Sequence, residues 1–230
     1  MKYPNFNEEK KLWKKGYKFV AGLDEAGRGP LAGPVVAGAV VVLDYKQVKI
    51  KNINDSKKLS EKQREYFYKI LTNHKYIKWG IGIVSEKVID KINILEATKL
   101  AMQKTLTSLR AAAKQSQPRG LLRRLRPPRN DEDYFLIIDG NFGLDTNLPQ
   151  KSIIKGDQKV FSIAAASIIA KVTRDRIMQK FHKKYPLYGF GKHKGYGTKA
   201  HFASLQNFGP CKIHRKSFYP IKSYPQRDGD

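Results

Sequence analysis

Carboxylates follow directly after apolar, strand-like runs at three separate places in the sequence. These places are Leu23-Asp24-Glu25, Ile137-Ile138-Asp139-Gly140 and Ile153-Ile154-Lys155-Gly156-Asp157. In a sheet protein, acids at strand ends can converge beyond one edge of the sheet. Convergent carboxylates repel one another, and a bound divalent cation can neutralise that repulsion. The pattern therefore predicts a metal site made from these acids.

The ligand type narrows the choice of metal and its chemistry. Carboxylate oxygens without histidine or cysteine select Mg²⁺ or Mn²⁺ rather than zinc. Two such ions about 3.5–4 Å apart can activate a water and stabilise the leaving oxygen of a phosphodiester. A strand-terminal aspartate also serves commonly as a turn residue or a helix N-cap. Composition and spacing alone leave this structural role open as an alternative for the acids.

The composition indicates the partner. The 230 residues include 45 Lys and Arg against 20 Asp and Glu, a formal charge of +25. Such a balance is typical of proteins that bind polyanions, nucleic acid above all, although ribosomal and membrane-surface proteins share it. The single cysteine, Cys211, excludes an internal disulfide framework and a zinc site built on several thiolates.

Size and hydropathy predict a protein of the cytoplasm. Hydrophobic residues make up 40% of the chain, enough for one substantial core. Residues 1–18 are polar and charged, unlike a signal peptide, and no stretch approaches the ~20 apolar residues that span a bilayer. We expect a monomer that does not enter a membrane.

The acids must be positioned by a mixture of strands and helices. Apolar and β-branched runs predict strands at 17–24, 35–43, 76–84, 134–139 and 151–154, and helical spacing predicts helices at 7–15, 60–73, 94–109, 160–185 and 198–207. Residues 27–34 must form a turn, because their glycines and prolines permit neither a helix nor an interior strand. Early strands are consecutive and later ones are separated by helices. This order favours an α/β or α+β domain with a mixed sheet.

The composition changes abruptly at 110–130. This segment holds seven basic residues, no acidic residue and three prolines. It offers too little patterned apolar surface to offset the entropy of ordering. We expect a disordered basic insertion whose arginines add nonspecific affinity for nucleic acid.

One motif is long enough to identify a family. Residues 22–37 read GLDEAGRGPLAGPVVA, and this run resembles the signature of bacterial ribonuclease HII. Matching stretches follow in order at 54–59 (NDSKKL), 138–141 (IDGN), 155–157 (KGD), 165–175 (AASIIAKVTRD), 193–198 (HKGYGT) and 214–218 (HRKSF). The resemblance covers residues 17 to about 220, and the segment 110–130 departs from it.

The resemblance implies a fold and a metal site. The fold would be an α/β, ribonuclease H-like mixed sheet flanked by helices. A catalytic domain would lie at 1–185 and a small helical, substrate-binding region at 186–230. The family's four catalytic, metal-binding carboxylates correspond here to Asp24, Glu25, Asp139 and Asp157. The pattern of strand-terminal acids had singled out the same residues.

The resemblance also implies substrate contacts. Gly27, Arg28 and Gly29 would approach the minor groove and contact a ribose 2′-hydroxyl, because glycine lets the backbone come close to a sugar. Tyr196 would stack on the sugar after the ribonucleotide; without the family, a half-buried aromatic is the simpler interpretation. Phosphate or groove contacts are expected from Ser56, Lys57, Lys58, Lys192 and Lys194, against the alternative of a solvated basic surface. Arg174 and Asp175 could form a local ion pair.

The function expected is that of a type 2 ribonuclease H. Such an enzyme hydrolyses the RNA strand of RNA–DNA hybrids and cuts 5′ to ribonucleotides embedded in duplex DNA, leaving 3′-hydroxyl and 5′-phosphate ends in DNA replication and repair. Two alternatives stay open. Another acid-dependent nuclease, such as a Holliday-junction resolvase or a 3′–5′ exonuclease, would not need the embedded ribonucleotide. A noncatalytic basic RNA-binding protein would bind without metal and tolerate loss of Asp24.

Overall fold

A five-stranded mixed sheet forms the centre of the protein. The computed structural model describes residues 3–115 and 133–225, with the backbone alone at 110–115. The strands are β1 (Phe19–Ala26), β2 (Val35–Val42), β3 (Ile77–Val84), β4 (Tyr134–Asp139) and β5 (Gln150–Ile153), in the spatial order β3-β2-β1-β4-β5. The first three pair antiparallel, whereas β1–β4 and β4–β5 pair parallel. The predicted mixed sheet is confirmed.

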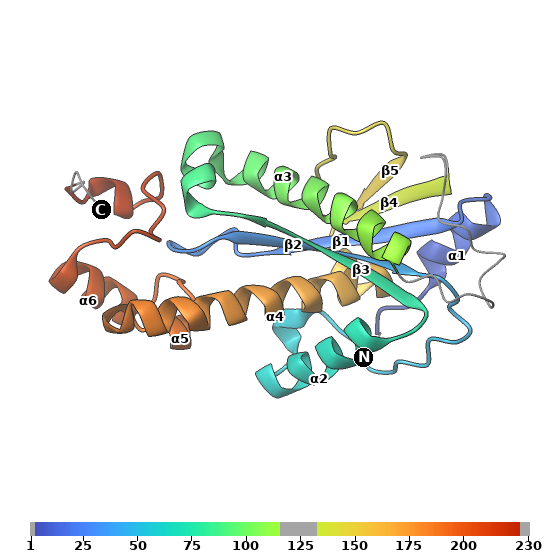
Figure 1. Cartoon of the computed structure of the whole chain (residues 1–230), viewed down its shortest axis with the longest axis horizontal. Coiled ribbons are helices and arrows are strands. Elements are labelled where there is room, and N and C mark those ends of the chain that lie inside the picture. Colours follow the sequence, from blue (N-terminus) through green and yellow to red (C-terminus); the bar gives the residue numbers. More distant parts are fainter. Residues whose placement is uncertain (1–2, 116–132, 226–230) are drawn as a thin grey trace.

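Helices cover both faces of this sheet. They are α1 (Asn7–Lys14), α2 (Glu61–Asn73), α3 (Glu86–Gln115), α4 (Phe161–Lys184), α5 (Phe190–His193) and α6 (Lys199–Phe208). Figure 1 shows α3 along one face, α4 with α2 on the other, and α5 and α6 beyond one end of the sheet. None of the helices in the described part of the chain is long and apolar enough to cross a membrane.

Alternation along β1 explains how the sheet carries both a core and a site. Phe19, Ala21 and Leu23 are buried in the cluster under α3, so the even-numbered residues face α4. Gly22 is one of these, and a Cβ there would lie 2.4 Å from the carbonyl carbon of Ser162. The absent side chain lets α4 approach the sheet closely. Asp24, two residues on, points to the same face.

One predicted helix begins where the sequence pattern placed it, and another begins earlier. The helix predicted from residue 60 is confirmed, because Ser60 forms a capping box with Gln63. The helix expected at 94–109 is longer: α3 begins at Glu86, passes a kink at Asn93, where φ is 67°, and ends at Gln115. The expectation that 110–130 lacks regular structure is therefore wrong for 110–115. The remainder, 116–130, lies outside the described residues.

The C-terminal segments share a core with α4 and with the turn that follows β1. Phe190, Leu205 and Ile213 are buried in one cluster with Leu31 and Ala32 of the β1–β2 turn and Met178 of α4. A bridge pairs Ala32 with His214, and the Gly33 N–H donates to the Ile213 carbonyl. The C-terminal region therefore packs directly on the turn that follows β1. The division into two functional regions at residue 185 stays a prediction.

Candidate active site

Three aspartates meet at the ends of neighbouring strands. Asp24 lies near the end of β1, Asp139 ends β4, and Asp157 lies in the 3-10 turn Gly156–Gln158 after β5. The parallel register of β1 and β4 aligns Leu23 with Ile138, so the residues that follow emerge together. One carboxylate oxygen from each aspartate lies within 4.8 Å of the others. Asp24 and Asp157 are each only 5% exposed.

Backbone donors fix the orientation of two of these carboxylates. Asp24 Oδ1 accepts from the Glu25 N–H at 2.7 Å. Asp139 Oδ1 accepts from the Gly156 N–H at 2.6 Å, which ties the end of β4 to the turn that carries Asp157. That turn begins at Lys155, whose φ of 54° is left-handed. The site is thus built by backbone geometry at three strand ends.

The acids raise one another's pKa values. Burial first, and then the charges of Glu25, Asp139 and Asp157, hold the pKa of Asp24 well above its usual range. Burial and the neighbouring Asp55 and Asp139 raise the pKa of Asp157 to about 7. The cluster therefore carries unfavourable negative charge, which a bound cation would relieve.

Glu25 lies beside the three aspartates but outside their cluster. Its Oε1 is 3.5 Å from the Arg28 guanidinium, and its Oε2 is buried without a hydrogen-bond partner among the described residues. Burial raises the pKa of Glu25, and Asp139 adds to that rise. A buried, unpartnered carboxylate oxygen next to three clustered oxygens fits a hard divalent cation. Asp24, Asp139 and Asp157 could hold the ion, with Glu25 at its edge.

Asp55 is a fifth acid at this site, which the sequence pattern did not select. It is 4% exposed. Its Oδ1 accepts from the Lys57 N–H at 2.8 Å, and its Oδ2 accepts from the Gln158 amide at 3.3 Å. Asp55 thereby joins the turn at Ser56–Lys58 to the turn that carries Asp157. Its signal in the sequence was its position as the N-cap of a short Ser-Lys-Lys turn.

The predicted phosphate contacts divide into exposed and buried groups. Lys57 and Lys58 are exposed. Burial lowers the pKa of Lys57, but the charges of Asp24, Asp55 and Asp157 outweigh this effect and raise it overall. Ser56 is buried, and its hydroxyl lies 2.7 Å from that of Ser167 on α4. Its hydroxyl therefore holds the turn, and Lys57 and Lys58 face outward.

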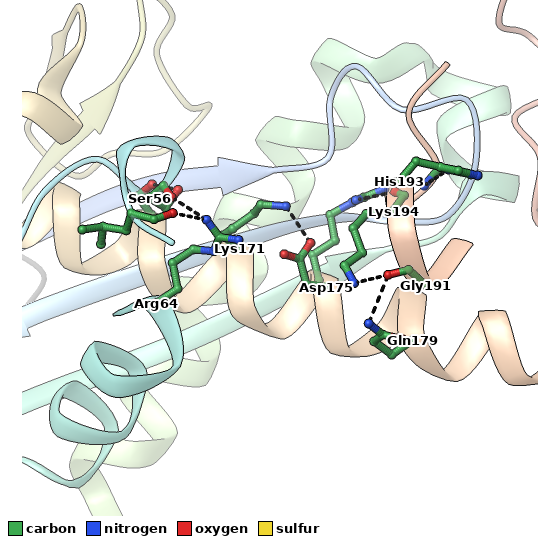
Figure 2. A network of polar contacts seen from close by, with 12 residues as sticks. Ser56, Arg64, Lys171, Asp175, Gln179, Gly191, His193 and Lys194 are labelled. Atoms are coloured by element: carbon green, nitrogen blue, oxygen red, sulfur yellow. Dashed lines mark hydrogen bonds and ion pairs between the residues drawn. The ribbon is translucent and has the colours of Figure 1, made fainter. Parts of the chain in front are cut away.

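Figure 2 shows how this turn is tied to α2 and how polar contacts continue along α4. The Arg64 guanidinium donates to the carbonyl oxygens of Ser56, at 3.1 Å, and Leu59. Farther along α4, Lys171 pairs with Asp175 at 2.7 Å. The local Arg174–Asp175 pair suggested by the sequence is therefore replaced by Lys171–Asp175.

Two buried arginines hold the glycine-rich turn after β1. Arg174 donates to the carbonyls of Ala32, Pro34 and Lys194 at 3.0–3.1 Å. Arg215 donates to those of Gly27 (2.5 Å), Arg28 (2.9 Å) and Gly33 (3.0 Å). Neither guanidinium has an acidic partner among the salt bridges of the described residues. Two positive charges thus lie beneath the turn, where they favour a polyanion.

The arginines also explain Gly27. Its φ of +103° is left-handed, and a Cβ there would lie 2.1 Å from Arg174 Nε. Because the carbonyls of Gly27 and Arg28 bond inward to Arg215, the turn presents its other edge to a ligand. The sequence did not reveal the roles of these two arginines. Apart from the contact of Arg174 with Lys194, every one of these hydrogen bonds joins residues more than 130 positions apart.

Tyr196 lies beside this turn. It is 42% exposed, and a Cβ on Gly29 would lie 3.8 Å from its ring. Its hydroxyl is near enough to Lys57 to raise that lysine's pKa. Lys192 is exposed, whereas Lys194 is 8% exposed and its ammonium donates to the Gly191 carbonyl at 2.5 Å. The structure therefore brings Tyr196 beside Gly29 and within electrostatic range of Lys57, and it buries Lys194.

The family model and the sequence relatives agree on a single family. The family model described as Ribonuclease HII matches residues 21–220. The chain is 51% identical to Ribonuclease HII of Chlamydia muridarum, over 91% of this chain and 86% of that protein. It is 51% identical to Ribonuclease HII of Acetivibrio thermocellus, over 91% of this chain and 73% of that protein. The crystal structure of ribonuclease H2 from Pyrococcus horikoshii has a similar fold, with a TM-score of 0.63 and 27% identity, covering 89% and 96% of the two chains.

Proposed function

The chain belongs to the ribonuclease HII family, and on that premise we propose that it cuts duplex DNA on the 5′ side of embedded ribonucleotides. As a type 2 ribonuclease H it is a hydrolase that acts on RNA–DNA hybrids. The finer specificity adds a requirement for a ribonucleotide next to the cut and the release of 3′-hydroxyl and 5′-phosphate ends. Its cellular task would be the removal of misincorporated ribonucleotides and RNA primers in the cytoplasm, by a monomeric enzyme.

One observation carries the proposal: a turn of glycine and arginine lies directly beyond the cluster of acids. Asp24 and Gly27 are three residues apart, and Arg215 fixes the carbonyls at Gly27 and Arg28 from beneath. A ribose held against this turn would have its phosphate close to the carboxylates. Tyr196, beside Gly29, would meet the following sugar and favour one that lacks a 2′-hydroxyl.

The residues would divide the work as follows. Asp24, Asp139 and Asp157, with Glu25 beside them, would hold Mg²⁺ or Mn²⁺. Two such ions would supply water activation and stabilise the leaving oxygen. Lys57 and Lys58 would bind phosphates of the duplex. Ser56 would act through its turn, which it anchors to Ser167. No covalent bond between enzyme and substrate is needed.

The test uses a DNA duplex with one embedded ribonucleotide and an all-DNA duplex of the same sequence. Each is incubated with Mg²⁺, with Mn²⁺ or with a chelator. Cutting of the first duplex alone, 5′ to the ribonucleotide and only with metal, supports the proposal. Cutting of both duplexes would assign a general nuclease instead, and tight binding without cutting would assign a binding protein.

Two variants complete this test. Asp24→Asn keeps the oxygen that accepts from the Glu25 N–H but loses the charge, and it should cut at least about 100-fold more slowly. Asp145→Asn changes an exposed acid in the loop after β4 and should cut like the wild type. Equal activity of the two variants would contradict the assignment of the acids.

A further inference from the structure

Tyr196 lies in a short loop whose shape is set by its backbone. The two preceding residues are both left-handed, Lys194 with φ 54° and Gly195 with φ 86°. The Tyr196 N–H donates to the His193 carbonyl at 2.9 Å, and the Tyr196 carbonyl accepts from the Thr198 N–H at 2.9 Å. The residue is 42% exposed, so its neighbours cover only part of the side chain. The position of the ring therefore depends on what anchors this loop.

A buried pair of histidines provides an anchor. His201 Nδ1 lies 2.9 Å from the Tyr196 carbonyl oxygen, and His201 Nε2 lies 3.0 Å from His214 Nε2. The Cys211 N–H donates to His214 Nδ1 at 2.8 Å. His201 is fully buried and His214 is 2% exposed. One chain of hydrogen bonds thus runs from the C-terminal segment through two imidazoles to the backbone of Tyr196.

The groups at the two ends of this chain of hydrogen bonds determine where its protons lie. A carbonyl only accepts, so His201 Nδ1 must carry a proton and, in a neutral ring, its Nε2 must accept. His214 Nε2 must then carry the second proton, which leaves His214 Nδ1 free to accept from the Cys211 N–H. The short Cys211 contact demands the same arrangement from the other end. His214 Nδ1 also lies 3.2 Å from the Cys211 carbonyl oxygen, but that carbonyl already accepts from the His214 N–H at 2.9 Å. Each neutral ring therefore has one tautomer that completes the chain of hydrogen bonds.

The environment keeps both rings neutral. Burial lowers the pKa of His201 to about 4 and that of His214 to about 3. His193 stacks on His201 at 4.5 Å between centroids, accepts from the Gly195 N–H at 3.2 Å and bonds to the Tyr188 carbonyl at 2.7 Å. The described residues offer no cluster of metal-binding groups that includes these histidines. Hydrogen bonding accounts for the geometry without a metal.

We propose that His201 and His214 are positioning residues, which hold the Tyr196 loop against the glycine-rich turn and so set how the enzyme fits the sugar after the ribonucleotide. The inference rests on the proposed role of Tyr196 in the function above. The histidines do not touch substrate. They act through the Tyr196 carbonyl, and their loss should resemble a partial loss of Tyr196.

A double-mutant cycle on the full-length protein tests this inference. kcat/KM is measured on the duplex with one ribonucleotide for the wild type, Tyr196→Ala, His214→Phe and the double variant. Phenylalanine keeps the aromatic volume and removes the hydrogen bonds. We expect His214→Phe to lose about tenfold in the wild-type background and less than about twofold in the Tyr196→Ala background. His74→Phe, at the far end of α2, is the matched control and should cut like the wild type.

Replacement of His201 separates positioning from general stability. The amide of His201→Asn can occupy the place of Nδ1 and still donate to the Tyr196 carbonyl, whereas His201→Phe cannot. Activity should be largely retained in the first variant and lost about tenfold in the second, although both break the contact with His214. Should His214→Phe fail to fold, this pair replaces it in the cycle. Equal losses for the two variants would overturn the inference.

Long-range ¹H–¹⁵N correlation of the imidazoles in the wild type gives a readout that does not depend on activity. The expected result at neutral pH is the Nδ1–H tautomer for His201 and the Nε2–H tautomer for His214. The reverse tautomers, or a charged ring, would overturn the inference. If Tyr196→Ala cuts as fast as the wild type, the role of Tyr196 and this inference fail together. If Tyr196→Ala is slow and the His214→Phe loss multiplies with it, the inference alone fails.

Discussion

Removal of one charge from the acidic cluster should stabilise the metal-free protein while it abolishes catalysis. The carboxylate oxygens lie within 4.8 Å of one another, and two unit charges at that outer distance repel by about 3.5 kcal/mol at an effective dielectric constant of ~20. The raised pKa of Asp24 relieves part of this repulsion through protonation. We therefore expect Asp24→Asn to gain about 1–2 kcal/mol in free energy of unfolding without metal.

The assay is thermal unfolding in a chelator and in excess Mn²⁺. A chain of this length shifts its Tm by about 2–4 °C per kcal/mol, so Asp24→Asn should melt about 2–8 °C above the wild type in the chelator. Metal at about 100 times its Kd should stabilise the wild type by about 2.7 kcal/mol, and it should stabilise the variant much less. The control Asp145→Asn should follow the wild type in both conditions.

The opposite result would be an Asp24→Asn variant that is less stable than the wild type in the chelator and is stabilised by metal as much as the wild type. Such a variant would contradict this expectation. That result would mean that Asp24 stabilises the fold through its hydrogen bond with the Glu25 N–H. It would not be a source of charge repulsion that a bound cation relieves. A variant that melts higher and still cuts would instead separate the charge of Asp24 from the chemistry.

Three further results are expected. In the absence of metal, the free energy of unfolding should fall as the pH rises from about 4 to about 7. The pKa of Asp157 is raised from 3.8 to about 7, so the folded state holds that proton more tightly than the unfolded chain does. Urea titrations at several pH values should show a smaller fall for Asp157→Asn. Arg215→Lys should lose about 3 kcal/mol in free energy of unfolding, measured in urea, because one ammonium cannot satisfy three buried carbonyls. The control Arg176→Lys, at an exposed pair with Glu65, should lose less than about 1 kcal/mol. Equal losses would contradict the role of Arg215. Deletion of 116–130, which removes five arginines, should leave cutting intact. It should reduce the slope of the logarithm of the DNA-binding constant against the logarithm of the salt concentration by about 2–4. An unchanged slope would show that the segment does not touch nucleic acid.

Most regular elements could be predicted because their signals are local. Strand β2 is an unbroken β-branched and apolar run, and the capping box at Ser60 is complete within four residues. The errors fell where local signals compete. Asn93 interrupts the helical conformation in the middle of α3, so spacing revealed the second half of that helix and hid the first. The short helix α5 was also missed, since four residues carry too little periodicity.

The candidate site could be predicted in part for the same reason. Asp24, Asp139 and Asp157 each follow an apolar strand or its turn, and parallel pairing of β1 with β4 brings them together. Asp55 could not be ranked with them, because it follows no strand and comes beside Asp157 only in the folded chain. Glu25 was included because it follows Asp24 at the end of the same strand-like run, and its place beside the cluster rather than within it is visible only in the folded chain.

The sequence by itself determined the kind of protein this is: the basic balance, the strand-terminal acids and the motif at 22–37 indicate a metal-dependent enzyme of nucleic acid. Only the tertiary structure decided how the turn after β1 is held. Arg174 and Arg215 look like surface cations in the sequence, yet both are buried and bond to carbonyls of the turn after β1. The physical reason is that backbone carbonyls carry no residue identity. A side chain that satisfies them from more than 100 positions away therefore leaves no local pattern to find.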